Sequence, residues 1–400
     1  MLYGLVDALQ GWLDQRGLSW LVMVMYQIEF RALFAALLAF AIMLAAGPRS
    51  IAWLRRKKIG DSAQFDLEGV NQLMQSRAGT PTMGGILICG ALLFSTLMLA
   101  DVLHNRYVQL GIFVVVWLAV VGGFDDWLKL TQARRERGVR DGLFAWEKLL
   151  FQIGLGLVVG FFLYRAGTSE GAHVFNLPFQ RTYVPTPSIE SLIRQPDLAP
   201  GVIILGTGAF AIYAALMIAG MSNAVNITDG MDGLATGNLI IAGLAMMVLA
   251  WIAASPRAAF FLMVPEVAGS GELLVMMGAM VGACLGFLWF NCSPASVFMG
   301  DTGSLALGGL LAYVASAIRQ EVLLLVIGGV FLMECGSVMA QMSWFKYTRR
   351  KYGEGRRIFR CAQIHNHFHL TGWSEQQVVV RFWLMTVVLA TIALVSLKLR

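Results

Sequence analysis

Long apolar stretches alternate with short polar connections along almost the whole chain. Each stretch is close to the length of about 20 residues that an α-helix needs to cross a hydrocarbon core of about 30 Å. The strands of a membrane β-barrel would instead alternate apolar and polar residues. The pattern therefore predicts an all-α integral membrane protein, a polytopic bundle of about ten transmembrane helices at residues 32–52, 83–103, 108–124, 149–164, 202–222, 234–254, 273–290, 304–318, 321–343 and 380–397.

The composition favours the same class, because 58% of the residues are hydrophobic and only 14% are charged, whereas about a quarter of a soluble protein is charged. Residues 1–31 lack the basic start and the small-residue cleavage site of a signal peptide, so they are interpreted as an N-terminal interfacial segment. Residues 32–400 are interpreted as one ten-span domain.

Basic residues concentrate in alternate connections. The first, third and ninth stretches are followed by "RRKK", "LKLTQARRERGVR" and "KYTRRKYGEGRRIFR". Because Lys and Arg are enriched in cytoplasmic loops, these connections are predicted to face the cytoplasm below a bacterial inner membrane, with both termini on the outer side. The predicted cytoplasmic-face cleft is built from loops 53–82, 125–148, 223–233, 291–303 and 344–379, and the outer stretch 165–201 is a loop or a short hairpin.

Two adjacent acids end the third stretch, in "GGFDDWLKL". Asp125 and Asp126 repel each other and are poorly solvated at a membrane edge, so a cation or a shared proton is expected to hold them. They are candidates for a base or a magnesium site. The alternative is a solvated helix end with an i,i+3 pair to Lys129.

The connection "SNAVNITDGMDGLATG" carries an acid or an amide at every third position. On a helix such a row lies close to one face and could bind a polar ligand. A loop rich in turn-forming residues is the alternative. The row consists of Asn223, Asn226, Asp229 and Asp232.

A lone carboxylate, Asp301, follows the seventh stretch within "NCSPASVFMGDTGS". Gly300 permits close backbone approach, and Thr302 and Ser304 could cap the next helix. A cap alone would explain the motif. With the other acids, however, Asp301 also suits Mg²⁺, which usually takes one or two carboxylates plus phosphate oxygens.

Three histidines alternate in "RRIFRCAQIHNHFHLTGW". On an extended segment His365, His367 and His369 would share one face, as zinc ligands can. Contact with phosphate, beside several arginines, fits the surroundings better.

Glu334 lies deep in the ninth stretch, where an acid is either functional or held by a buried hydrogen bond. The turn "GTPTMGG" before the second stretch is by itself a weak signal.

Carboxylates, Lys129, Lys148, histidines and glycine turns thus meet at one predicted membrane face. This combination favours phosphoryl transfer, in which catalysis is mostly positioning and charge neutralisation by metal and cations. A transporter would also bury acids, but near the membrane midplane and in paired repeats, and no such repeat is visible here.

The motifs "GTPTMGG", "DDWLK", "GLFAWEK", "NAVNITDGMDGLA", "WFNCSPASVFMGDTGSL" and "RIFR" with "IHNHFHLTGWSE" resemble, in order, those of the phospho-N-acetylmuramoyl-pentapeptide transferases. These belong to the polyprenyl-phosphate N-acetylhexosamine-1-phosphate transferases. The resemblance covers about residues 30 to 397. It implies Mg²⁺-dependent transfer of phospho-MurNAc-pentapeptide from UDP-MurNAc-pentapeptide to undecaprenyl phosphate, giving lipid I and UMP. It also implies a lipid-bilayer setting, a homodimer and no nucleic-acid partner.

The resemblance assigns roles by motif position. Asp301 would be the magnesium ligand, Asp125 or Asp126 would deprotonate or orient the lipid phosphate, and His365 would line the diphosphate region as a fourth catalytic candidate. The expected substrate-binding residues are Lys129 and Lys148 on phosphates, Asn226, Asp229 and Asp232 around the uridine, Phe298 stacked on uracil, Asn291 at the diphosphate, and Thr82, Gly300, Ser304 and His367.

This sequence departs from the family at the histidine loop. The family has three consecutive histidines, whereas Asn366 stands in the middle here, and an amide cannot carry the proton charge of an imidazole. The nearest alternative is a sister transferase that uses UDP-N-acetylglucosamine. The "HLTGWSE" and "NITDGMDGLA" forms favour the muramoyl enzyme.

Overall fold

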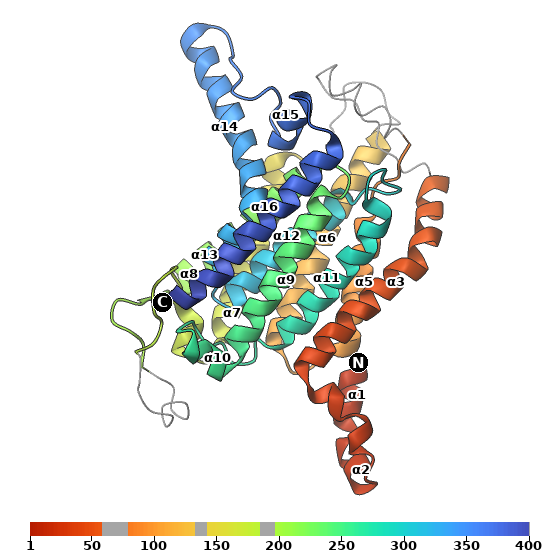
Figure 1. Cartoon of the computed structure of the whole chain (residues 1–400), viewed down its shortest axis with the longest axis vertical. Helices are drawn as coiled ribbons and strands as arrows, with labels where there is room; N and C mark the ends of the chain where they lie inside the picture. Colours follow the sequence, from red (N-terminus) through yellow and green to blue (C-terminus); the bar gives the residue numbers. More distant parts are fainter. Residues whose placement is uncertain (58–78, 133–141, 185–196, 400) are drawn as a thin grey trace.

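The computed structural model describes residues 1–57, 79–132, 142–184 and 197–399. Each of the ten predicted stretches forms a helix or, in one case, a bent pair of helices, so the all-α prediction is confirmed (Figure 1). The helices are α3 (Ile28–Arg56), α5 (Gly85–Leu99), α6 (Arg106–Gln132), α7 (Ala145–Ala166), α8 (Thr207–Thr228), α9 (Leu234–Ala254), α11 (Glu272–Asn291), α12 (Gly300–Ala317), α13 (Glu321–Ile327) with α14 (Gly329–Tyr352), and α16 (Glu375–Ser396).

Not all of these helices are long and apolar enough to cross a membrane alone. Within the described residues seven are, and the pair α13–α14, bent by 77°, raises the number to eight. Helix α5 has only 15 residues, about 22 Å at 1.5 Å per residue. Helix α12 begins with Gly-Asp-Thr-Gly-Ser, which lowers its apolar character. By length and composition, seven or eight of the described elements could therefore span a membrane by themselves, and the protein is a multi-pass helical bundle as predicted.

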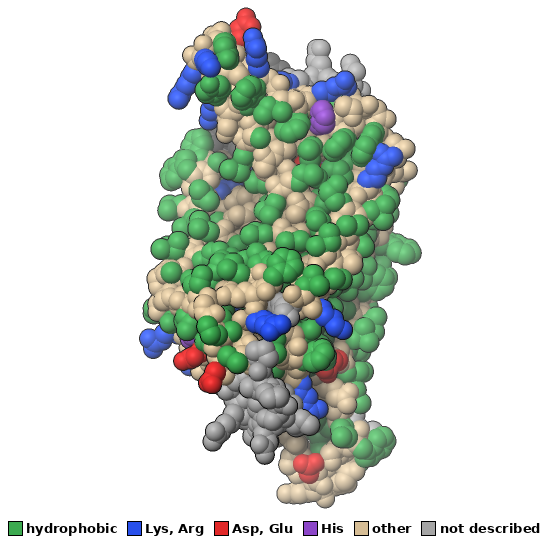
Figure 2. Space-filling view, turned by 60° about the vertical axis from the view of Figure 1, so that its left-hand side comes forward, with side chains coloured by type: hydrophobic (Ala, Val, Ile, Leu, Met, Phe, Trp, Pro, Cys, Tyr) green, Lys and Arg blue, Asp and Glu red, His purple; other side chains and the backbone are tan. Residues whose placement is uncertain are grey.

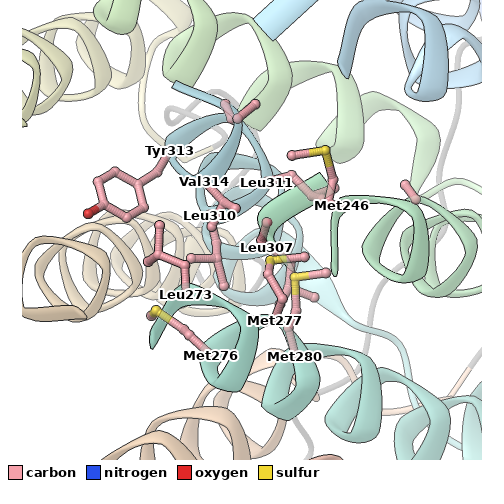
Figure 3. Packing of buried hydrophobic residues seen from close by; sticks show 14 of the residues in the cluster. Met246, Leu273, Met276, Met277, Met280, Leu307, Leu310, Leu311, Tyr313 and Val314 are labelled. Carbon is pink, nitrogen blue, oxygen red and sulfur yellow. The ribbon is translucent and has the colours of Figure 1, made fainter. Parts of the chain in front are cut away.

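Small residues set how closely the helices pack. Gly278, Gly282 and Gly286 of α11 recur every four residues and face α3; a Cβ at Gly282 would lie 1.9 Å from the Ala36 carbonyl oxygen. Such small-residue spacing lets transmembrane backbones approach each other. Where α9, α11 and α12 meet, Met246, Met277 and Leu307 interdigitate in the core (Figure 3).

Helix α12 is the centre of the bundle. All its residues from Asp301 to Ala317 are buried, and it packs on α6, α8, α5 and α9. A helix surrounded on every side places its first turn at a fixed position among its neighbours. The polar sequence "GDTGS" lies in that first turn, so the helix starts earlier than the predicted span 304–318.

Smaller elements cover the other end of the bundle, away from the first turn of α12 (Figure 1). Two-residue strands β1 (Val174–Phe175) and β2 (Ile203–Ile204) pair antiparallel. The described part of stretch 165–201 therefore contributes one strand to a short hairpin, which was one of the two structures predicted for it. Ahead of α3 lie α1 (Leu2–Ala8), α2 (Gln10–Gln15), η1 (Ser19–Leu21) and η2 (Met23–Tyr26), and the other short elements are η4 (Glu170–His173), α10 (Pro256–Phe261) and η6 (Leu397–Leu399). Helix α15 (Ile364–Leu370) instead lies beside α14, at the end that holds the first turn of α12 (Figure 1).

The described parts of the five predicted loops lie at one end of the bundle, the upper end in Figure 1. Residues 58–78 of the first loop and 133–141 of the second are outside the described residues. Figure 2 shows apolar side chains over the middle of the molecule and charged ones mainly near its two ends, as expected for a protein embedded in a bilayer. Which end faces the cytoplasm stays a prediction.

Candidate active site

Two carboxylates and two ammonium groups form a closed cluster at the first turn of α12. The Nζ of Lys148 lies 2.6 Å from Oδ2 of Asp125 and 2.7 Å from Oδ2 of Asp301. The Nζ of Lys129 lies 2.9 Å from Oδ2 of Asp125 and 3.2 Å from Oδ1 of Asp301. Four groups from three separate motifs are thus in direct contact.

Three helix ends hold this cluster. Asp125 and Lys129 are one turn apart near the end of α6, Lys148 lies in the first turn of α7, and Asp301 opens α12. The chain entering α7 adds a backbone donor, since the Leu143 N–H donates to Oδ1 of Asp125 at 2.6 Å. The predicted ion pair of Lys129 therefore exists, but its partner is Asp125 at i,i+4 rather than Asp126 at i,i+3.

Asp126 has a different role from its neighbour. Its Oδ1 accepts a hydrogen bond from the Asp301 N–H at 3.1 Å, and its Oδ2 accepts from the N–H and the hydroxyl of Thr302 at 3.0 and 2.7 Å. An acid on α6 thus caps the N-terminus of α12, where the helix dipole favours negative charge. The expectation that Thr302 and Ser304 would cap this helix was wrong, because both lie inside it and Ser304 Oγ donates back to the Gly300 carbonyl.

The cluster is partly shielded from solvent. The side chain of Asp125 is 0% exposed, that of Lys148 17% and that of Lys129 45%. Burial of the Asp301 carboxyl would raise its pKa, but its contacts with Asp125, Lys129 and Lys148 outweigh burial and hold the pKa below the usual 3.8. Asp301 is therefore ionised at neutral pH, and Lys129 is the most accessible charge of the cluster.

The weak motif "GTPTMGG" is docked directly beside the cluster. The Phe298 N–H donates to the Pro81 carbonyl at 2.8 Å, and the Phe298 carbonyl accepts from the Gly84 N–H at 2.9 Å. The Thr82 hydroxyl lies against Gly300, since a Cβ there would be 3.0 Å from Thr82 Oγ1 and 2.8 Å from Asp126 Oδ2. Gly300 has φ +74°, which suits glycine.

Two further glycines let the neighbouring helices reach α12. A Cβ at Gly122 of α6 would lie 2.2 Å from the Asp301 carbonyl oxygen, and one at Gly85 of α5 would lie 2.1 Å from the Gly303 nitrogen. These contacts fix the distance between Asp125, on the turn after Gly122, and Asp301. The sequence contains them as "GG" pairs, but their partners were not predictable.

The donor set suits a hard cation. The described residues contain no group of three or more His, Cys, Asp or Glu arranged to hold a metal. Mg²⁺, however, needs only one or two protein carboxylates when phosphate oxygens supply the rest. Asp125 and Asp301 meet this condition, because one ammonium nitrogen already touches an oxygen of each. Asp126 does not, because both its oxygens accept hydrogen bonds from α12.

Comparison with known families agrees with this arrangement. The family model "Glycosyl transferase family 4" matches residues 107–319, which include Asp125, Lys148 and Asp301. The chain belongs to glycosyl transferase family 4. Residues 78–89, which include the docked "GTPTMGG" segment, match the phospho-N-acetylmuramoyl-pentapeptide-transferase signature 1. The protein is therefore a phosphotransferase enzyme that acts on phospho-sugars, and the transporter alternative is set aside.

The row of Asn and Asp residues does not form one ligand-facing helical face in the transferase. Helix α8 ends at Thr228, so Asn226 lies on it, Asp229 is its C-cap and Asp232 lies in the following turn. Asp232 Oδ2 accepts from the Ala295 N–H at 2.9 Å, and Asn223 donates to Gln152 at 2.6 Å. Asp232 thus joins this turn to the loop before α12, and the expected uridine contacts are not tested.

Asn291, expected at the diphosphate, lies in a structural hydrogen-bond network of the transferase. Its Oδ1 accepts from the Gly233 N–H at 3.1 Å and from the Thr236 hydroxyl at 2.8 Å, while its Nδ2 donates to the Val297 carbonyl at 3.0 Å. It is buried. These contacts hold the loop 291–299 on α9. Phe298 itself is half-buried beside the signature segment.

The histidine loop of the transferase is helical, not extended, because α15 covers residues 364–370. The three histidines therefore do not share the single face that an extended segment would have given them. His365 is buried with its Nδ1 3.1 Å from Glu334 Oε2, whereas His367 Nδ1 accepts from the Arg360 N–H at 3.2 Å. His369 Nδ1 lies 2.8 Å from the Trp373 carbonyl. The three side chains have three different surroundings.

His365 connects this helix to the "DGMDG" turn. A Cβ at Gly230 would lie 2.5 Å from His365 Nε2, so the imidazole fits against that backbone. Asn366 donates to Gln363 Oε1 at 2.9 Å, and Gln363 donates to the Ile227 carbonyl at 3.3 Å. Asn366 thus supports a second link to the end of α8. Glu334, the acid noted deep in the ninth stretch, is thus held by buried contacts with His365, whereas the contact of the Leu143 N–H with Asp125 had no sequence signal.

Proposed function

We propose that this transferase moves phospho-MurNAc-pentapeptide from UDP-MurNAc-pentapeptide to undecaprenyl phosphate and so forms lipid I and UMP. The observation that carries the proposal is the signature segment, whose described residues 79–89 pack against the loop that presents Asp301. In the reaction an oxygen of the acceptor phosphate bonds to the sugar-bound phosphorus. The bond from that phosphorus to UMP breaks, and UMP leaves with the electron pair.

Charge repulsion is the main obstacle to this reaction, since both reactants carry phosphates. Lys129 and Lys148 can exchange their carboxylate partners for phosphate oxygens, and the exposed Lys129 is the first that an incoming substrate meets. Asp301, with Asp125, would hold Mg²⁺, which when bound neutralises charge on the phosphate oxygens. The donor chemistry of the two acids supports this assignment.

Asp125 acts in this proposal by orienting the acceptor and the lysines. A phosphate monoester has a second pKa of about 6, so the acceptor phosphate is largely dianionic at neutral pH. No base is then required to deprotonate it. Asp126 supports the site by holding the first turn of α12. Phe298, Asn226, Asp229 and Asp232 stay as proposed uridine contacts, and His365, His367, Thr82, Gly300 and Ser304 as proposed substrate contacts.

The test uses the purified full chain with Mg²⁺, undecaprenyl phosphate and UDP-MurNAc-pentapeptide. Release of UMP is expected, and it should stop when a chelator removes the metal. A parallel reaction with UDP-N-acetylglucosamine separates the sister enzyme, because turnover with that donor alone would contradict the muramoyl assignment. Placement in the bacterial inner membrane with the site towards the cytoplasm, and a homodimer, belong to the same proposal.

A further inference from the structure

Residues 344–360 comprise the end of α14 and the chain that folds back along it, and are here called the basic finger. Helix α14 stops at Gly353, which has φ +79°. The return is fixed by Gln341 Oε1, which accepts from the Ile358 and Phe359 N–H groups at 2.8 and 3.0 Å. Thr348 Oγ1 accepts from the Arg356 N–H at 2.8 Å. The finger is therefore a defined surface.

The basic finger carries an unusual concentration of positive charge. Seven of its 17 residues are Lys or Arg and one, Glu354, is acidic, so its formal net charge is +6. The whole chain also has a net charge of +6, so the rest of the protein sums to zero. All seven basic residues are exposed, namely Lys346, Arg349, Arg350, Lys351, Arg356, Arg357 and Arg360.

These cations have no acidic partners in the part of the chain that the structure describes. Instead, Lys351 lies 5.5 Å from the centre of the Tyr347 ring and 5.3 Å from that of Tyr352, and Arg356 lies 5.2 Å from Tyr352. Cations over aromatic rings keep their charge available to an external anion. The finger is therefore a positive surface that the protein itself does not neutralise.

The surface of α14 changes from apolar to aromatic as it enters the finger. Met339 and Met342 on the preceding turns of α14 are exposed and apolar, and the exposed aromatic side chains Trp344, Tyr347 and Tyr352 follow. Such aromatic residues mark the boundary between acyl chains and headgroups. The finger projects at the same end of the bundle as the candidate active site (Figure 1). Figure 2 shows blue side chains around this projecting tip, above an apolar surface.

From this placement we propose that the basic finger binds the headgroups of anionic phospholipids in the leaflet next to the active site. Clusters of four to eight basic residues directly beyond a transmembrane helix attract anionic lipid, and the attraction falls with salt. The inference is independent of the sugar substrate. Binding would gather negatively charged lipids beside α14 and fix the height of the finger in the membrane.

The experiment is native mass spectrometry of the detergent-purified full chain, titrated with phosphatidylglycerol or phosphatidylcholine. The wild type is expected to bind phosphatidylglycerol more tightly, and the triple variant Arg349→Gln, Arg350→Gln, Lys351→Gln to lose at least about five-fold of that affinity, since one basic residue near a surface is worth about that factor. Replacing the two arginines by lysine should retain it.

A matched control removes the same charge at the other end of the protein, through Arg106→Gln, Arg181→Gln and Arg257→Gln, which are also exposed. Thermal unfolding of each variant verifies that it is folded. Equal loss in the control, or no lipid preference in the wild type, would overturn the proposal. Displacement of the lipid by inorganic phosphate at equal concentration would do so as well, because it would indicate a general anion site.

Discussion

Asp126 caps a helix to which it does not belong, because its Oδ2 accepts hydrogen bonds from the N–H and the hydroxyl of Thr302, at 3.0 and 2.7 Å. The next residue back along the chain, Asp125, faces the lysines instead. Successive residues near the end of α6 thus divide two tasks: one holds α12 in place, and the other meets the charges that substrates would meet.

The two acids should therefore respond differently to the same substitution. Asp126→Asn replaces one acceptor oxygen by an NH₂ group that faces donors, which should cost about 2 kcal/mol of unfolding free energy. Asp125→Asn also turns an NH₂ group towards donors, but these are the ammonium groups of Lys129 and Lys148, which can move away on flexible side chains, and an acceptor remains for the Leu143 N–H. It should therefore cost less stability than Asp126→Asn, but should lower turnover at least about 100-fold. Thermal unfolding and UMP release measure the two effects. Equal loss of stability in both variants would contradict the division of roles.

The lysines provide a second prediction. Lys148 is the less exposed of the two lysines and contacts both carboxylates at 2.6 and 2.7 Å. Lys148→Gln should therefore reduce turnover more than Lys129→Gln does. Each variant should lose roughly 10²-fold or more, as when other groups that stabilise developing charge are removed. Because Lys129 is more accessible, its loss should raise KM more than it lowers kcat. Steady-state kinetics with the donor varied separates these effects, and an unchanged KM in the Lys129 variant would count against substrate capture by this residue.

Much of this architecture was predictable because hydrophobic patterning is strong in a membrane protein. The positions of all ten helical segments follow from it, and four residues that the motifs single out are in contact, namely Asp125, Lys129, Lys148 and Asp301. The boundaries were less accurate. Helix α12 starts at Gly300 because an acid on another helix caps it, and no local signal in "GDTGS" reveals that acid.

The remaining differences between the predictions and the structure have the same physical origin, because contacts with residues distant in the sequence determine them. The histidine loop is a helix because His365 is held by Glu334 from α14, 31 residues earlier. The alternation of histidines would place them on one face only of an extended segment. Asn291 has an amide side chain that could bind a ligand, yet its hydrogen bonds go to Gly233, Thr236 and Val297. Polar residue type alone does not separate a substrate contact from a loop support.

Glu334 and His365 form a third testable pair, both fully buried. Glu334 Oε1 also accepts from the His365 N–H at 3.2 Å, so the acid fixes both the backbone and the ring that rests on Gly230. Glu334→Gln should lower turnover by about 10 to 100-fold, with Glu334 acting as a positioning residue. Because residues in contact are not additive, the double variant with His365→Asn should be no worse than His365→Asn alone. If the fold-loss of turnover in the double variant equals the product of the two single losses, the two residues act separately.

Helix contact at the site gives the last prediction, which concerns Gly85. A Cβ at this position would lie 2.1 Å from the backbone nitrogen of Gly303 and 3.0 Å from the Met299 carbonyl oxygen, and neither backbone atom can move without shifting the first turn of α12. Gly85→Ala should therefore destabilise the protein by about 1–3 kcal/mol through overpacking and reduce turnover, because Asp301 moves with that turn. Gly90 on the same helix is the matched control, since nothing lies within 4 Å of its added Cβ. Gly90→Ala should be neutral or stabilise by up to about 1 kcal/mol. Thermal unfolding and UMP release of both variants decide the matter, and a Gly85→Ala enzyme as stable and active as Gly90→Ala would show that the contact between α5 and α12 does not set the geometry of the site.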